Sequence, residues 1–272
     1  MISFNWTVRP HAWVKGSPEN LQVQTEGIYL IERFDLPGKN YHPMEEYPLL
    51  FKAFSELEPN EEHILKFTDN YGWLGIGNFV NVEHENNPIS FPWQDQPVGL
   101  ATPGEGLSDW QKSILEMKTS VEIWEKIARG HWGFLAARIV WEKGGVWLCS
   151  GEKKELIAGN DGPNEELFAS WPRGDVLRPA RFILQKTINK NLKYRVSPVL
   201  LWDENYDLKD YLLPENLLAT LWLQFYIAVS GKKKFIRCEI CGEWMDATGK
   251  RSDFKAHSKC LKREWARKKR RV

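Results

Sequence analysis

The chain has 272 residues, enough for one large domain or two smaller ones, and 42% hydrophobic with 27% charged residues is a globular composition. No apolar run approaches the roughly 18 residues that a membrane-spanning helix needs, so we do not expect a transmembrane protein. The N-terminus lacks the basic-then-apolar pattern of a secretory signal peptide. We therefore expect a cytoplasmic protein.

The formal net charge of +1 hides an uneven distribution of charge along the chain. Residues 231–272 hold 15 Lys and Arg against 5 Asp and Glu, so residues 1–230 are net acidic. An acidic body followed by a strongly basic end is typical of proteins that contact nucleic acid or another anionic surface. Docking of the basic end on the acidic body of the same chain is the alternative explanation.

The first hundred residues predict a mixture of strands and helices. Residues 4–8 alternate apolar and polar side chains, as in a half-buried strand, and residues 27–34 form a second strand candidate. Residues 47–57 carry a helical pattern of apolar side chains. Residues 83–106 are rich in Pro, Gly and Asn and predict a loop.

The most regular helical pattern begins at Ser108 and is expected to end near Gly130. Ser108 and Gln111 form a capping-box pattern, in which the serine hydroxyl accepts a free backbone N–H. Apolar residues then recur every three or four positions and predict one buried face. These residues are Trp110, Ile114, Met117, Val121, Trp124 and Ala128.

The second half of the body predicts a β-hairpin, two helices and a strand. The hairpin turns around residues 143–145, and residues 179–191 and 194–202 predict a helix and a strand. The last helix is expected to start at Pro214, because proline suits the first helical position, and to end at Gly231.

The strongest functional signal is a set of ligand-like residues near the C-terminus. Cys238 and Cys241 form a Cys-x2-Cys pair, and His257 and Cys260 form a His-x2-Cys pair. Three thiolates and one imidazole form a common ligand set for Zn²⁺, and four protein ligands leave no open position. We therefore expect a structural zinc rather than a catalytic one. A water molecule or a remote residue in place of His257 is the alternative.

A treble-clef-like module is expected around these ligands, with a knuckle, a short hairpin and a helix from about Ser258 onward. Trp244 and Phe254 are expected to be its packing residues, and metal binding would supply much of its folding energy. The predicted fold class is α+β, with a mixed helix and strand body over residues 1–230 and this zinc module over residues 231–272. The linker before Cys238 is short, which suggests that the module rests against the body.

A cluster of Lys and Arg follows the second ligand pair and predicts contacts with the phosphates of a nucleic acid. We expect these contacts from Lys262, Arg263, Arg267, Lys268, Lys269, Arg270 and Arg271. Attraction to phosphate does not distinguish DNA from RNA, so both stay open, although DNA is the nucleic acid we expect. A solvated cationic tail without a partner is the alternative.

The finger segment resembles the C-terminal zinc finger of the bacterial CGNR-type family. The resemblance lies in Cys238-x2-Cys241-Gly242-Glu243-Trp244, a basic loop, and a second ligand pair that leads into an Arg/Lys-rich helix. Residues 217–225 resemble the helix before that finger, and residues 67–75 and 104–110 resemble motifs of the family's body.

The chain departs from this family at the second ligand pair. The family has two cysteines with three residues between them, whereas this chain has His257-x2-Cys260, and Cys260-Leu261-Lys262-Arg263 stands where the family has Cys-Gly-Asn-Arg. The resemblance implies a DNA-binding transcriptional regulator whose N-terminal domain senses a small-molecule effector.

Two other classes of function stay open. An enzyme would need an active site in the body, but the body histidines lie in no recognisable metal or nucleophile motif, and we predict no catalytic residue. These are His11, His42, His63, His84 and His131. A protein-interaction module is the third class, since zinc knuckles also bind proteins. Salt-sensitive binding to arbitrary duplex DNA would separate the nucleic-acid function from it.

Overall fold

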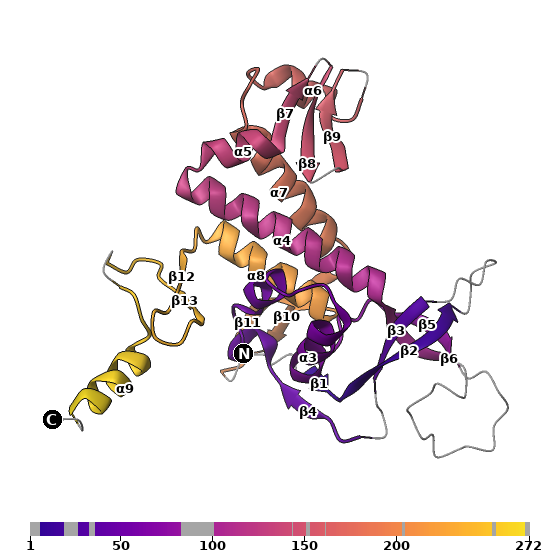
Figure 1. The fold of residues 1–272 in the computed structure, drawn as a ribbon, viewed down its shortest axis with the longest axis vertical. Coiled ribbons are helices and arrows are strands. Elements are labelled where there is room, and N and C mark those ends of the chain that lie inside the picture. Colours follow the sequence, from indigo (N-terminus) through magenta and orange to yellow (C-terminus); the bar gives the residue numbers. More distant parts are fainter. Residues whose placement is uncertain are drawn as a thin grey trace.

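The computed structural model describes residues 6–18, 27–32, 36–82, 101–142, 144–150, 153–160, 162–202, 205–251 and 254–269 (Figure 1). Helices and strands are mixed along the chain, which confirms the α+β prediction at this level. Within these described ranges, no helix is long and apolar enough to cross a membrane.

The N-terminal strands form a small closed barrel beside a two-stranded pair. β1 (Trp6–Val8) pairs with β4 (Lys39–Tyr41), and the antiparallel barrel runs in the order β2 (His11–Pro18), β3 (Gly27–Glu32), β6 (Ala101–Gly106), β5 (Asn78–Val82). The strands expected over residues 4–8 and 27–34 are confirmed where they are described. The loop expected over residues 83–106 is wrong at its end, because β6 begins at Ala101; residues 83–100 lie outside the described chain.

The centre of the body is a group of packed helices. α2 (Leu50–Ser55), α4 (Leu107–Arg129), α7 (Leu177–Leu192) and α8 (Leu217–Ser230) contact one another and carry most of the buried core. The shorter helices are α1 (Pro43–Glu46), α3 (Glu61–Tyr71), α5 (Trp132–Arg138) and α6 (Glu165–Ser170). In Figure 1, α4 and α7 run beside each other toward the sheet formed by β7, β8 and β9.

Helix α4 has the predicted buried face but a different start. Five of the six predicted apolar residues, Trp110, Ile114, Met117, Val121 and Trp124, are buried, whereas Ala128, near the C-terminal end, is exposed. The capping box is wrong: the helix begins at Leu107, Gly106 is the N-cap, and no side chain caps it. Gly130 ends the helix with φ +67°, a left-handed conformation that glycine adopts without steric cost.

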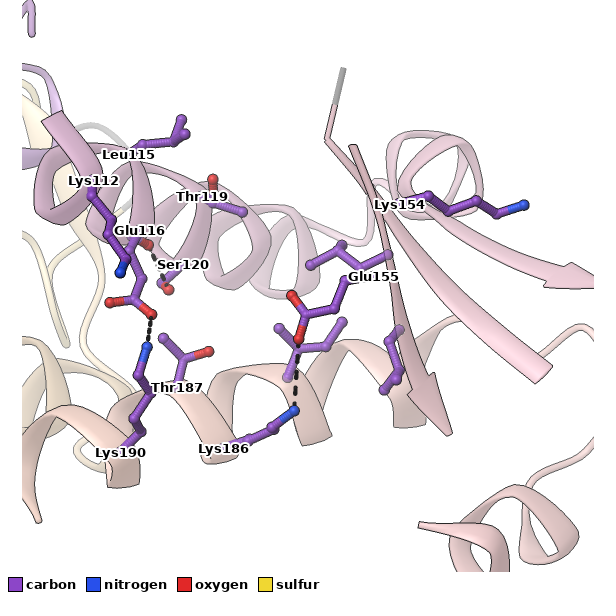
Figure 2. A pocket seen from close by; sticks show the side chains of 13 residues that line it. Lys112, Leu115, Glu116, Thr119, Ser120, Lys154, Glu155, Lys186, Thr187 and Lys190 are labelled. Carbon is purple, nitrogen blue, oxygen red and sulfur yellow. Dashed lines mark hydrogen bonds and ion pairs between the residues drawn. The ribbon is translucent and has the colours of Figure 1, made fainter. Parts of the chain in front are cut away.

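The late body contains the predicted hairpin within a three-stranded antiparallel sheet. Its strands are β7 (Ile139–Glu142), β8 (Gly145–Ser150) and β9 (Lys153–Gly159). This sheet lies over one end of the seam between α4 and α7 (Figure 2). β10 (Val196–Trp202) pairs with β11 (Leu208–Pro214) as a separate antiparallel pair.

Helix α8 starts later than the sequence predicts. Pro214 is the last residue of β11, and Asn216 caps the helix, its side chain accepting the Ala219 N–H at 2.8 Å. Asn216 also donates to the Gly75 carbonyl at 3.1 Å, which ties the helix start to the loop after α3. The predicted end at Gly231 is confirmed.

Candidate metal centre

The first ligand pair lies in a tight knuckle between two short strands. β12 (Phe235–Arg237) pairs with β13 (Trp244–Asp246), and Arg237 is opposite Trp244. The Cys238 N–H donates to the Glu243 carbonyl, and the Gly242 N–H donates to the Cys238 carbonyl, both at 2.9 Å. Gly242 has φ +74°, so a residue with a side chain would be strained there.

The second ligand pair lies at the start of a helix, as the sequence predicts. α9 (Ser258–Lys269) begins directly after His257, whose carbonyl accepts the Cys260 N–H at 3.0 Å and the Leu261 N–H at 3.1 Å. The Glu239 N–H donates to the Lys255 carbonyl at 3.0 Å and joins the knuckle to the segment before the helix. Two separate segments are thereby brought together.

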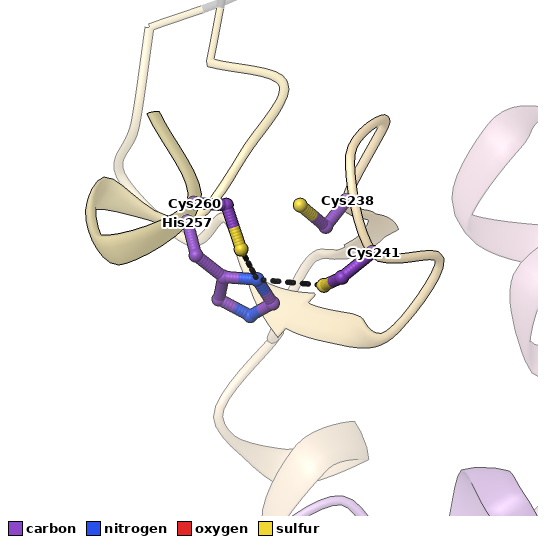
Figure 3. Close-up of side chains that lie close together, drawn as sticks. All are labelled: Cys238, Cys241, His257 and Cys260. Atoms are coloured by element: carbon purple, nitrogen blue, oxygen red, sulfur yellow. Dashed lines mark hydrogen bonds between the residues drawn. The ribbon is translucent and has the colours of Figure 1, made fainter. Parts of the chain in front are cut away.

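The four predicted ligands form one cluster (Figure 3). The Sγ atoms of Cys238, Cys241 and Cys260 and a ring nitrogen of His257 all lie within 4.8 Å of one another. His257 Nδ1 is 3.5 Å from the Cys241 Sγ and 3.9 Å from the Cys260 Sγ, so this nitrogen faces the sulfurs. Such a set of soft and borderline donors is compatible with a metal site.

The thiols of Cys238 and Cys260 have pKa values shifted in opposite directions. Desolvation opposes ionisation of Cys238, but hydrogen bonds from the backbone N–H groups of Cys241, His257 and Ile240 outweigh it and lower its pKa to about 6. Desolvation, followed by hydrogen bonds and charge repulsion from the neighbouring thiols, raises the pKa of Cys260 to about 11. One thiolate therefore forms readily, and further thiolates need a cation to offset their repulsion.

The module has a very small core of its own. Cys238, Met245, Ala256 and Cys260 are buried together, with Ile236 and Phe254 packed against them. Phe254 is thus a packing residue as predicted. The prediction is wrong for Trp244, which is not part of this core: its ring lies against Lys52 of α2 in the body and Arg237 of β12.

Contacts with the body hold the module through the turn of helix α2. Trp244 Nε1 donates to both carboxylate oxygens of Glu56 at 3.2 Å, and Arg237 forms an ion pair with the same carboxylate. The Lys52 Nζ lies 4.0 Å from the centre of the Trp244 ring. The sequence gives no signal for these contacts, because Glu56 and Trp244 are far apart along the chain.

The predicted phosphate-contact residues are described only in part. Lys262 and Arg263 are exposed on α9, and Lys250, Arg251, Lys255 and Lys259 of the module are exposed as well. Arg267, Lys268 and Lys269 belong to α9, but their side chains, and the whole of Arg270 and Arg271, lie outside the described part of the chain. Sequence reasoning missed the exposed apolar residues Leu261 and Trp265, although their spacing of four places them on one face of α9.

The body histidines that the structure describes do not form a comparable cluster. Within the described residues, the Cys238–Cys241–His257–Cys260 group is the one set of three or more potential metal ligands. His11 is buried in β2 beside Trp73, and His84 lies outside the described chain.

Comparisons of the chain with models of protein families, with curated proteins and with solved structures find no match.

Proposed function

We propose that the Cys3His cluster binds one structural Zn²⁺ and organises a treble-clef-like finger that presents helix α9 to DNA. The main support for this proposal is the spacing of the ligand atoms. Tetrahedral zinc, with Zn–S near 2.3 Å and Zn–N near 2.0 Å, separates a sulfur and a nitrogen ligand by about 3.6 Å. The two distances from His257 Nδ1 to sulfur are 3.5 and 3.9 Å.

Charge and core size also support a bound zinc. A divalent cation offsets the repulsion among the thiolates of Cys238, Cys241 and Cys260, and binding it releases the protons that the thiols hold. Because the buried core of the module consists of a few small side chains, ligand bonds would supply much of its folding free energy.

The charge on the module supports phosphate as its target. Lys262 and Arg263 are exposed on the first turns of α9, and the same helix continues into further Lys and Arg. Cations arranged along one helix neutralise successive phosphates and release condensed counterions. The proposed role is that of a DNA-binding transcriptional regulator related to the bacterial CGNR-type proteins, with residues 1–230 as the sensing body.

The metal proposal is tested by the zinc content of purified protein. We expect about one zinc per chain in the wild type and loss or weakening of zinc binding in Cys238→Ser and His257→Ala. Cys149→Ser is the matched control, because Cys149 lies in β8 of the body, and it should keep its zinc. A wild-type protein without zinc, purified without chelators, would contradict the proposal.

The DNA proposal is tested by the salt dependence of binding to a duplex. Alanine at Arg263, Arg267, Lys268, Arg270 and Arg271 should weaken binding and reduce the slope of log K against log salt by about 4.5, since each of the five lost phosphate contacts contributes about 0.9. Lys66→Ala with Lys118→Ala, on exposed body positions, is the control and should leave the slope unchanged. Unchanged affinity in the five-residue variant would remove the proposal.

A protein-interaction module is the second candidate, and one observation favours it. Ile240, Leu261 and Trp265 of the module are 40%, 52% and 66% exposed, and exposed apolar side chains mark contacts with proteins more often than contacts with phosphate. Binding to a protein with little dependence on salt, without duplex binding, would support this second function.

A further inference from the structure

The body contains a cleft that is separate from the metal centre. It lies between α4, α7 and strands β8 and β9, and its volume is about 550 Å³. Small-molecule sites in proteins typically occupy roughly 300–1,000 Å³. Figure 2 shows α4 and α7 as its two facing walls, with β9 at one end.

The floor of this cleft is apolar. Ile157 of β9 and Ile183 of α7 are 4% and 9% exposed and line it, and Leu148 of β8 and Leu115 of α4 are its other apolar lining residues. Leu115 is 52% exposed, which leaves apolar surface in contact with water. An apolar chain laid on this floor would remove that surface from water.

Two of the four lysines that line the cleft form ion pairs across it. Lys190 of α7 donates to the Glu116 carboxylate of α4 at 2.7 Å, and Asn191 donates to it at 3.1 Å. Lys186 pairs with Glu155 of β9 at 3.7 Å.

The third lysine, Lys154 on β9, also forms an ion pair, at the edge of the cleft. Lys154 pairs with Glu142 of β7 in the same sheet and lies 5.1 Å from the centre of the Trp147 ring. The two glutamates that line the cleft, Glu116 and Glu155, are both taken by lysines of α7.

Lys112 is the fourth lysine, and its charge is not balanced by an ion pair. It lies one turn before Glu116 on α4, and no described carboxylate is within ion-pair distance of it. The Thr119 and Thr187 side chains also line the cleft, from α4 and α7, and offer hydroxyl groups. The cleft therefore combines an apolar floor with one uncommitted cation at its margin.

We propose that this cleft binds a small apolar monocarboxylate, with its hydrocarbon part on Ile157, Ile183 and Leu115 and its carboxylate on Lys112. One uncommitted lysine matches one negative charge, whereas a phosphate dianion or a dicarboxylate would have to break the Glu116 or Glu155 ion pair. The site is independent of the finger, because every lining residue belongs to the body.

The test is calorimetric titration of the full-length protein with octanoate, and with octanol and octylamine as neutral and cationic probes of equal length. Octanoate should bind, and octanol and octylamine should bind at least about tenfold more weakly, since a hydrogen-bonded charge contributes about one factor of ten in affinity. Lys112→Met should weaken octanoate binding about tenfold. Lys118→Met, on an exposed position of the same helix outside the cleft, should leave it unchanged.

A pair of substitutions at Leu115 tests whether the carboxylate of bound octanoate lies at this end of the cleft. Because Leu115 is exposed, either charged residue is compatible with folding. Leu115→Glu should weaken octanoate binding, and Leu115→Lys should keep or strengthen it. Absence of octanoate binding at millimolar concentration, equal binding of octanol and octanoate, or equal affinities in the Lys112→Met and wild-type proteins would each overturn the proposal.

Discussion

The indole Nε1 of Trp244 donates to both oxygens of the Glu56 carboxylate at 3.2 Å, so one side chain of α2's C-terminal turn holds the finger module. Arg237 pairs with the same carboxylate, and Lys52 lies against the ring of Trp244. These groups are partly exposed, so the contact contributes little to global stability. Its effect is on the orientation of the module.

Replacing Glu56 with alanine should loosen the contact of Trp244 and Arg237 with the body, while Phe235 stays packed against Phe51 and Trp124. Arg237 and Trp244 would lose their common acceptor, and trypsin should then cleave the Lys232–Arg237 linker faster, with the unfolding free energy changed by no more than about 1 kcal/mol. Limited proteolysis and urea denaturation measure the two quantities. Glu62→Ala, on an exposed position of α3, is the control, and equal cleavage rates in both variants would contradict the expectation.

Removing the zinc that we propose for the Cys3His cluster should unfold the module and spare the body. The module's buried core is small, whereas the body has its own large core of packed helices. We therefore expect a zinc chelator to make the chain after about residue 237 sensitive to protease while the body's thermal transition stays within a few degrees. Joint loss of both structures would show that the body depends on the metal too.

Lys52 and Glu125 should respond unequally to mutation. The Lys52 side chain is 2% exposed and forms an ion pair with Glu125, while desolvation lowers its pKa. Glu125→Ala leaves a buried charge without its partner and should cost about 3 kcal/mol, whereas Lys52→Met removes that charge and should cost clearly less. Urea denaturation of both variants gives the difference; an equal loss would show that packing, rather than charge, determines the result.

His11 should make stability depend on acidity. Burial lowers its pKa to about 4, below the value near 6.5 of an unfolded histidine. The fold therefore keeps its full stability above pH 6.5 and loses it as the pH falls toward 4, by about 2 kcal/mol at pH 5. His11→Phe should remove the part of this loss of stability that His11 causes. His63→Gln, at a half-exposed position, should retain the loss. Identical pH profiles for wild type and His11→Phe would contradict this assignment.

Local patterns predicted the parts of the fold that are set by neighbours in the sequence. The buried face of α4 and the end at Gly130 followed from spacing and from glycine's conformational freedom. Helix starts were less predictable: Gly106 rather than Ser108 is the N-cap of α4, and α8 starts after the N-cap Asn216 rather than at Pro214. Pro214 belongs to a strand because β10 pairs with it, and that partner is not visible in the local pattern.

In the candidate site, too, local features were predictable from the sequence and long-range contacts were not. Each ligand pair is local, so spacing alone identified Cys238, Cys241, His257 and Cys260. The contact of Trp244 with Glu56 joins residues 188 positions apart, and the cleft at Lys112 needs α4, α7 and β9 together. Such neighbours depend on tertiary packing, which a single sequence does not display.

The burial of helix α8 bears on where the chain could accept an insertion before the finger. The helix is buried around its circumference from Leu217 to Phe225, and its C-terminal end leads into the finger within a few residues. Phe235, the first residue of β12, packs against the rings of Phe51 and Trp124 in the helical core. An insertion between Gly231 and Phe235 would therefore either pull Phe235 out of these contacts or loop out and leave the finger in place, so core packing limits how far linker length can set the position of the finger.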